Sequence, residues 1–163
     1  TMGGPVILRQ ERVGLDGTVF SIYKFRTMEP DRRRTTVPYI GEDRRQTHKS
    51  PDDPRITSVG RFLREWSLDE LPQFFNVLQG DMSLVGPRPE MVEIVARYEA
   101  WQHHRHAVKP GVTGPWQISE RGEKSLHECT ESDIEYLQSV SALTDLKILA
   151  LTPLAALGMR RGH

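Results

Sequence analysis

Pro72 is the residue that most constrains the fold of the central stretch, residues 61–90. Ser67 followed three residues later by Glu70 is a capping-box pattern and predicts a helix start. A helix capped by Ser67 would hold Pro72 at its fifth position, where proline has no N–H to donate and its ring crowds the preceding turn. The sequence therefore predicts either a distorted first turn or a regular helix that begins nearer Leu71.

Two adjacent acids, Asp69 and Glu70, stand at this helix start under both alternatives. Acids in a first turn can simply complement the helix dipole. They also suit phosphoryl transfer, because a carboxylate can attack a phosphate ester when arginines bind the phosphate oxygens and a divalent cation bridges the anions. Arg64 precedes the pair and Arg88 follows it between two prolines, so the residues alone leave both interpretations open.

Periodicity predicts further helices and one hairpin. Residues 5–10 and 18–25 read as two strands around an Asp16-Gly17 turn, which would place Lys24 and Arg26 on one face. Amphipathic helices are expected over residues 59–66 and 90–106, and a helix that is apolar almost all round is expected over residues 145–159. The central helix, which Gly80 can end, is expected to have an apolar face formed by Phe74, Phe75, Val77 and Leu78. We therefore expect one α+β domain over residues 1–163, mostly helical, with a small antiparallel hairpin near its N-terminus.

Composition excludes several classes of protein. The 163 residues fit one domain, and 22 basic against 22 acidic residues leave no net charge that would attract nucleic acid. The single cysteine, Cys129, cannot form an internal disulfide and fits a reducing compartment. No signal peptide and no apolar run of about 20 residues is present, so the chain as given is expected to be soluble.

Two polar segments invite binding hypotheses that we do not adopt. Residues 29–54 are rich in charge and have no apolar periodicity, which predicts a long mobile loop or a partly disordered insert. His103, His104 and His106 are spaced so that they do not share a helix face, so we assign no zinc site to them.

Three segments together resemble the bacterial sugar transferase family, the monotopic phosphoglycosyl transferases. They are residues 4–28 (GPVILRQERVGLDGTVFSIYKFRTM), 67–90 (SLDELPQFFNVLQGDMSLVGPRPE) and 109–119 (KPGVTGPWQIS). They occur in the family's order and cover most of residues 4–121. The chain departs from the family at Glu120, where a glycine usually precedes the arginine that matches Arg121.

The resemblance implies an activity and a set of site residues. Such enzymes move a sugar 1-phosphate from a UDP-sugar to polyprenol phosphate, which initiates bacterial glycan or exopolysaccharide assembly. By resemblance, Asp69 attacks the β-phosphorus and forms a covalent phosphosugar-aspartyl intermediate, Glu70 assists the second step as base or metal partner, and both carboxylates bind Mg²⁺. The residues implied in substrate or phosphate binding are Lys24, Arg26, Arg64, Arg88, Arg121 and Asp133.

The resemblance also implies a membrane context. Family members carry a hydrophobic re-entrant helix just before the segment that matches Gly4, so we expect this chain to be the catalytic domain without that helix. In the full-length protein it would lie at the cytoplasmic face of the inner membrane. Residues 145–159 predict a core helix or, alternatively, an interfacial helix on the lipid.

Alternatives of other classes remain. The chain could be an inactive docking module of the same fold, or a soluble metal-dependent nucleotide-sugar hydrolase that uses the same acid pair on water. Self-association is left open by the sequence.

Overall fold

The computed structural model describes residues 4–29, 55–119 and 130–158. Within these ranges helices predominate and the strands form two small sheets, one of them an N-terminal antiparallel hairpin. The predicted α+β class is therefore confirmed. The predicted polar loop, apart from Glu29, lies outside the described residues, as do Arg121 and Cys129.

The hairpin consists of β1 (Ile7–Val13) and β2 (Val19–Phe25), paired so that Ile7 lies opposite Phe25. A 3-10 turn, η1 (Leu15–Gly17), joins them, with Asp16 at φ 53° and Gly17 at φ 76°. Aspartate and glycine tolerate this left-handed region better than other residues, which is why this dipeptide forms the turn. The hairpin is confirmed, although its first strand continues three residues beyond the predicted end.

The central stretch folds into α1 (Ser58–Glu65), the 3-10 turn η3 (Leu68–Glu70) and α2 (Gln73–Gln79). Gly80 ends α2 at φ 87°, as predicted.

The face that α2 buries is not the predicted apolar one. Gln73 and Asn76 are buried, whereas Phe75 and Leu78 are 64% and 82% exposed. The Asn76 side chain accepts a hydrogen bond from the Tyr23 N–H at 3.1 Å and donates to the Ser21 carbonyl at 2.8 Å. Because these bonds satisfy backbone groups of β2, a polar side chain replaces apolar packing at this contact.

The second half of the chain forms short elements and one long helix. They are β3 (Ser83–Val85), α3 (Val92–Val95), η4 (Ala100–Ala107), β4 (Gly111–Thr113), α4 (Pro115–Ser119), α5 (Thr130–Gln138) and α6 (Ala142–Gly158). β3 and β4 pair in parallel.

The single helix expected over residues 90–106 is wrong, because the segment is divided into α3 and η4. Glu99 lies between them in an extended conformation and forms a capping box with Gln102, which starts a new helical segment. The capping residues thus interrupt a continuous apolar pattern.

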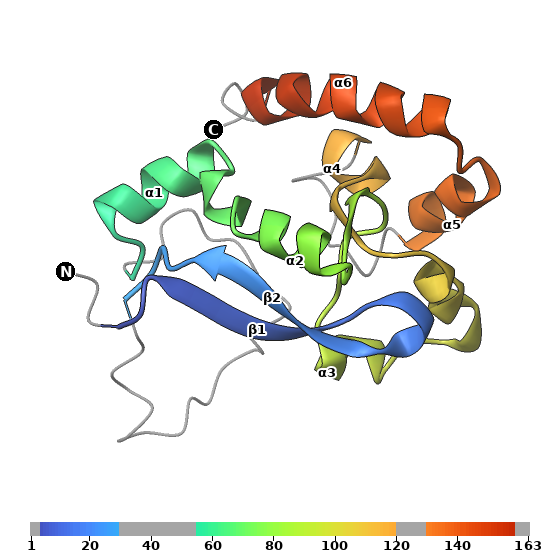
Figure 1. Ribbon diagram of the computed structural model, residues 1–163, viewed down its shortest axis with the longest axis horizontal. Helices are drawn as coiled ribbons and strands as arrows, with labels where there is room; N and C mark the ends of the chain where they lie inside the picture. Colours follow the sequence, from blue (N-terminus) through green and yellow to red (C-terminus); the bar gives the residue numbers. More distant parts are fainter. Residues whose placement is uncertain (1–3, 30–54, 120–129, 159–163) are drawn as a thin grey trace.

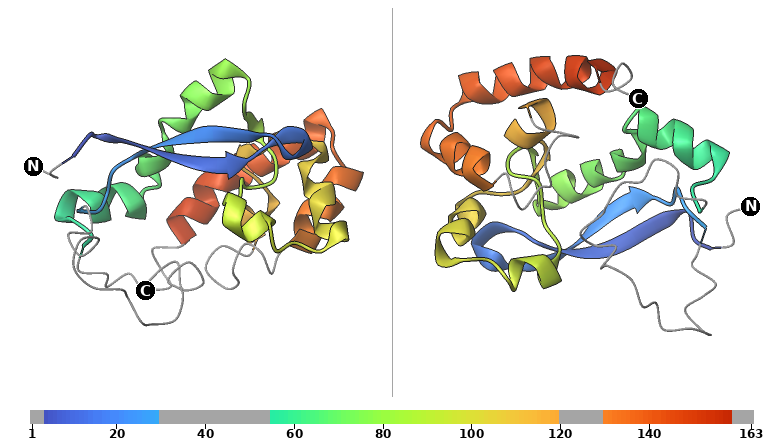
Figure 2. Two further views of the ribbon diagram at one scale, coloured as in Figure 1. Left: turned by 90° about the horizontal axis from the view of Figure 1, so that it is seen from below. Right: turned by 180° about the vertical axis from the view of Figure 1, so that it is seen from behind.

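Figure 1 shows the hairpin along one side of the molecule, α6 along the opposite side, and α2 between them; the view from behind in Figure 2 agrees. Val85, Tyr136 and Ile148 form a buried cluster that joins β3, α5 and α6. The rest of α6 is largely uncovered, with Leu143, Leu146 and Leu154 exposed. None of the helices in the described ranges has the length and apolar character required to cross a bilayer.

Candidate active site

The acid pair lies in η3, the single 3-10 turn between α1 and α2. Ser67 precedes it at φ 54° and makes no side-chain capping bond, so the predicted capping box does not form. Pro72 is the residue before α2, whose regular turns begin at Gln73. The proline explains this division, because it cannot donate within a continuous helix but is well tolerated where a helix begins.

Glu70 is bound to two cations that come from distant parts of the chain. Lys24 Nζ, from β2, lies 3.1 Å from Glu70 Oε1. Arg88 donates through both terminal nitrogens, to Oε2 at 3.1 Å and to Oε1 at 2.5 Å. This two-bond geometry fixes the plane of the guanidinium as well as its position.

Arg88 is also held through its backbone and through contact with an aromatic ring. Its neighbours Pro87 and Pro89 restrict the backbone, and the Pro87 carbonyl accepts from the Gly111 N–H at 2.9 Å. The Arg88 carbonyl accepts a bond from buried Arg105 at 2.8 Å, and the Arg88 guanidinium lies 5.6 Å from the centre of the Trp116 ring. The turn predicted from the two prolines is thus anchored on several sides.

Glycines allow this turn to lie against β4. A Cβ on Gly111 would come within 2.2 Å of the Gly86 nitrogen, and one on Gly114 within 2.0 Å of the Gly86 carbonyl oxygen. No side chain fits between the two backbones here. Gly111 and Gly114 of the third sequence motif therefore allow the two backbone segments to cross closely, and this crossing supports Arg88.

Arg64, on α1, is a third cation whose charge acts on the acid pair. Its Nε donates to Thr27 Oγ1 at 3.0 Å and its terminal nitrogen lies 3.3 Å from Met28 Sδ. α1 can come this close because Gly60 faces the Thr27 carbonyl, where a Cβ would lie only 1.9 Å from the oxygen. The segment after β2 thereby positions an arginine near the acid pair.

Asp69 differs from Glu70 in its surroundings. Among the residues that the structure describes, none donates a hydrogen bond to its carboxylate, which is partly buried. Burial and the neighbouring Glu70 carboxylate raise the pKa of Asp69, although Lys24, Arg64 and Arg88 act in the opposite direction. The same site lowers the pKa of Lys24, chiefly because that ammonium is buried. One carboxylate is thus bound to cations, while its neighbour has open oxygens.

The other predicted site residues are placed differently. Arg26 donates to the Pro5 carbonyl at 2.9 Å. Asp133, on α5, is fully buried and pairs with Arg105 at 2.6 Å. The structure brings together Lys24, Arg64, Asp69, Glu70 and Arg88, but it does not show Asp133 in contact with the acid pair.

Arg105 is a residue that sequence reasoning missed. It stands among His103, His104 and His106, and those histidines drew attention to metal binding. Its side chain is 1% exposed and donates to the Tyr98 hydroxyl at 2.6 Å as well as to the Arg88 carbonyl. An arginine inside an apolar repeat with a distant acid is a weak signal, and only the fold reveals the pair.

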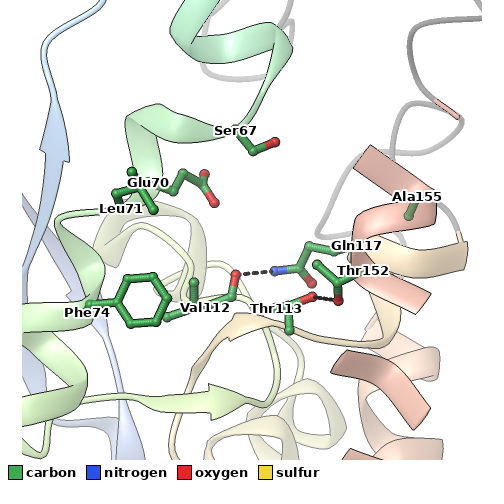
Figure 3. A pocket seen from close by; sticks show the side chains of 9 residues that line it. All are labelled: Ser67, Glu70, Leu71, Phe74, Val112, Thr113, Gln117, Thr152 and Ala155. Carbon is green, nitrogen blue, oxygen red and sulfur yellow. Dashed lines mark hydrogen bonds between the residues drawn. The ribbon is translucent and has the colours of Figure 1, made fainter. Parts of the chain in front are cut away.

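A pocket of about 140 Å³ opens beside Glu70 (Figure 3). Leu71 and Phe74 form one wall, Val112 and Gln117 another, and Thr152 and Ala155 of α6 a third. The pocket therefore connects the acid pair with the segment of the third sequence motif.

The acid pair meets only part of the requirement for a magnesium site. Mg²⁺ favours oxygen ligands, often one or two carboxylates together with substrate phosphates. Both oxygens of Glu70 already accept bonds from Lys24 and Arg88, whereas those of Asp69 are open. The residues fit an ion that is held by Asp69 and by the phosphates of a bound substrate.

Known proteins resemble this chain along most of its length. It is 44% identical over 153 residues to the galactosyl transferase CpsE of Streptococcus agalactiae serotype III (strain NEM316), covering 92% of this chain and 34% of that protein. It is 44% identical over 157 residues to the UDP-glucose:undecaprenyl-phosphate glucose-1-phosphate transferase of Escherichia coli (strain K12), covering 91% and 32%.

A third relative is covered more fully. The exopolysaccharide production protein ExoY of Sinorhizobium fredii (strain NBRC 101917 / NGR234) is 39% identical over 166 residues, covering 98% of this chain and 73% of that protein. The chain thus spans about a third of the first two relatives and most of ExoY. The profile described as bacterial sugar transferase matches residues 1–159. The chain belongs to the bacterial sugar transferase family.

Proposed function

We propose that this chain transfers a sugar 1-phosphate from a UDP-sugar to undecaprenyl phosphate, the first step in assembling an exopolysaccharide. Family membership and the names of the Escherichia coli and Sinorhizobium relatives support this activity. The observation that carries the proposal is the open carboxylate of Asp69 within reach of the charges of Lys24, Arg64 and Arg88.

In the first step, an Asp69 oxygen attacks the β-phosphorus of the UDP-sugar. A new P–O bond forms to Asp69 while the bond from that phosphorus to the bridging oxygen breaks, and UMP leaves with the bonding electrons. The three cations stabilise the charge that develops on the phosphate oxygens. Because burial and Glu70 raise the pKa of Asp69, its carboxylate is a stronger base than an exposed aspartate and a better nucleophile.

In the second step, a phosphate oxygen of the lipid acceptor attacks the phosphorus held on Asp69. The bond to Asp69 breaks, which restores its carboxylate and releases the sugar diphospholipid. Glu70 keeps Lys24 and Arg88 in place through both steps, since it is bonded to both. Its role as a base, and phosphate binding by Arg26 and Arg121, stay predictions.

Mg²⁺ belongs to this proposal as an ion that neutralises diphosphate charge when bound. Asp69 offers the open carboxylate for it, and Glu70 can contribute only lone pairs that its two cations leave unused.

The lipid acceptor requires that the site work at a membrane surface. Large apolar side chains are exposed on three helices, among them Phe62 on α1, Phe75 on α2 and Leu146 on α6. Exposed apolar surface of this kind is typical of protein or lipid contacts. We infer that these helices meet the lipid, at the inner-membrane face expected from the family.

The test is UMP release without a lipid acceptor. Wild-type protein, Asp69→Asn and Asp16→Asn are incubated with Mg²⁺ and UDP-glucose or UDP-galactose. Asp16 is a matched control, because it is an exposed aspartate in a turn whose left-handed backbone asparagine also accepts. The proposal predicts that UMP release stops near one equivalent in the wild type and in Asp16→Asn, and is abolished in Asp69→Asn.

Other outcomes point to other functions. Continuous UMP release without acceptor indicates a nucleotide-sugar hydrolase. No release from the wild type with any UDP-sugar indicates a docking module.

A further inference from the structure

The pocket beside Glu70 begins where the cation cluster ends. Glu70 contributes to its wall, whereas Lys24 and Arg88, which bind Glu70, do not line it. Its volume of about 140 Å³ is several times the roughly 30 Å³ that one water occupies in the liquid. A phosphate group would lie against the cations, and this pocket is a separate space next to it.

Gln117 lines this pocket and carries an unused hydrogen-bond acceptor. The residue is 5% exposed, and its Nε2 donates to the Val112 carbonyl at 3.3 Å, which fixes the orientation of the amide (Figure 3). Its Oε1 has no hydrogen-bond partner among the described residues. Burying such an oxygen without a donor is unfavourable, so a ligand that brings a donor gains from meeting it.

The threonines near Gln117 do not supply that donor. Thr152 Oγ1 donates to the Ile148 carbonyl at 2.8 Å and lies 2.7 Å from Thr113 Oγ1. A hydroxyl has one proton, so the Thr113 hydroxyl donates to Thr152 and both protons are used within the protein. This wall of the pocket therefore offers acceptors, and a complementary ligand must carry donors.

The chemistry of the substrates indicates which of their parts carries hydrogen-bond donors. Ionised phosphates and the hydrocarbon of a polyprenol have no donors, whereas the hydroxyls of a sugar do. In a UDP-sugar the transferred sugar is joined through one oxygen to the phosphorus that Asp69 attacks, so it lies nearer Glu70 than the uracil or the ribose. Leu71 and Phe74 add apolar surface against which the C–H groups of a sugar ring can pack.

We propose that this pocket binds the transferred sugar, with Gln117 Oε1 accepting a hydrogen bond from one of its hydroxyls. The inference rests on the proposed function, and it makes Gln117 a specificity-determining residue.

The test pairs substitutions in the protein with deletions in the substrate. The rate of sugar-phosphate attachment is measured by intact-protein mass for the wild type and Gln117→Leu, without lipid acceptor. The substrates are UDP-glucose or UDP-galactose, whichever reacts, and its monodeoxy sugar analogues. For one deoxy position we expect the wild type to lose about tenfold in rate, and Gln117→Leu to react equally with parent and analogue. Because each comparison is made within one protein, a general folding defect of the variant does not imitate this coupling.

Two further substrates locate the donor. UDP-sugars that carry N3-methyluracil or 2′-deoxyribose remove donors from the nucleotide instead of the sugar. Coupling of Gln117 to either of them overturns the assignment of the pocket to the sugar. Absence of coupling at every position overturns the proposal and leaves the pocket to solvent. If the wild type attaches no sugar phosphate from any UDP-sugar, the proposed function itself fails, and this inference with it.

Discussion

Asp133→Asn should cost the protein much of its stability, although the substitution removes only one charge. The Arg105 and Asp133 side chains are 1% and 0% exposed, and their ion pair is 2.6 Å long. Removing one partner of a buried pair leaves the other charge uncompensated, which typically costs about 3–5 kcal/mol. The remaining acceptors of Arg105, the Tyr98 hydroxyl and the Arg88 carbonyl, are neutral and compensate only in part.

Thermal and denaturant unfolding measure this cost. For a chain of this length the loss corresponds to a fall in Tm of roughly 6–20 °C. Glu131→Gln is the matched control, because Glu131 is an exposed acid on the same helix, and it should change stability by less than about 0.5 kcal/mol. The double substitution Arg105→Met with Asp133→Leu should recover part of the loss, since it leaves no buried charge.

The Asp133→Asn variant also decides between two roles for Asp133, when its kinetics are measured beside its unfolding. If Asp133 contacts substrate, as the family resemblance implied, Asp133→Asn should raise KM for the UDP-sugar with unfolding unchanged. That result would refute the reasoning from burial. If Arg105 instead holds the Arg88 carbonyl in place, stability and the rate of sugar-phosphate attachment should fall together, even well below the Tm of the variant.

Three further predictions concern the site and its surface. Because the pKa of Asp69 is raised, the rate of sugar-phosphate attachment should fall on acidification at a higher pH than it would with an ordinary aspartate. Glu70→Gln removes the neighbouring negative charge and should shift this acid limb of the pH–rate profile to lower pH. An acid limb that stays in place or shifts to higher pH would contradict the assignment of Asp69. In Gly60→Ala the added Cβ would lie 1.9 Å from the Thr27 carbonyl oxygen, so α1 should shift, and both Tm and the rate of attachment should fall. A Tm equal to that of the wild type would show that this contact relaxes freely. Leu146→Ser, at a side chain that is 63% exposed, should weaken binding to anionic vesicles by about tenfold with little change in Tm, and unchanged vesicle flotation would exclude α6 from the lipid contact.

Local turn chemistry was predictable from sequence because it depends on adjacent residues. The Asp16-Gly17 turn and the glycine at the end of α2 follow from backbone conformations that few residues accept. The grouping of Asp69 and Glu70 with Arg64 and Arg88 was also anticipated, since all four lie within one short stretch of chain.

Contacts between distant segments were not predictable in this way. α2 buries Asn76 because β2 offers unpaired backbone groups there, and periodicity instead favoured its phenylalanine face. Arg105 pairs with Asp133, which lies far along the chain on α5, and no spacing rule describes such a pairing. The helix over residues 90–106 failed for a local reason, because Glu99 and Gln102 form a capping box within an apolar repeat.

The proposed mechanism depends most on Asp69 forming a covalent bond to phosphorus. The direct measurement is fragmentation mass spectrometry of the protein, digested after brief reaction with a UDP-sugar without lipid acceptor. We expect one added sugar phosphate, on the peptide that contains Asp69 and localised to that residue. A sugar phosphate on any other residue, or sustained UMP release with unmodified protein, would contradict it.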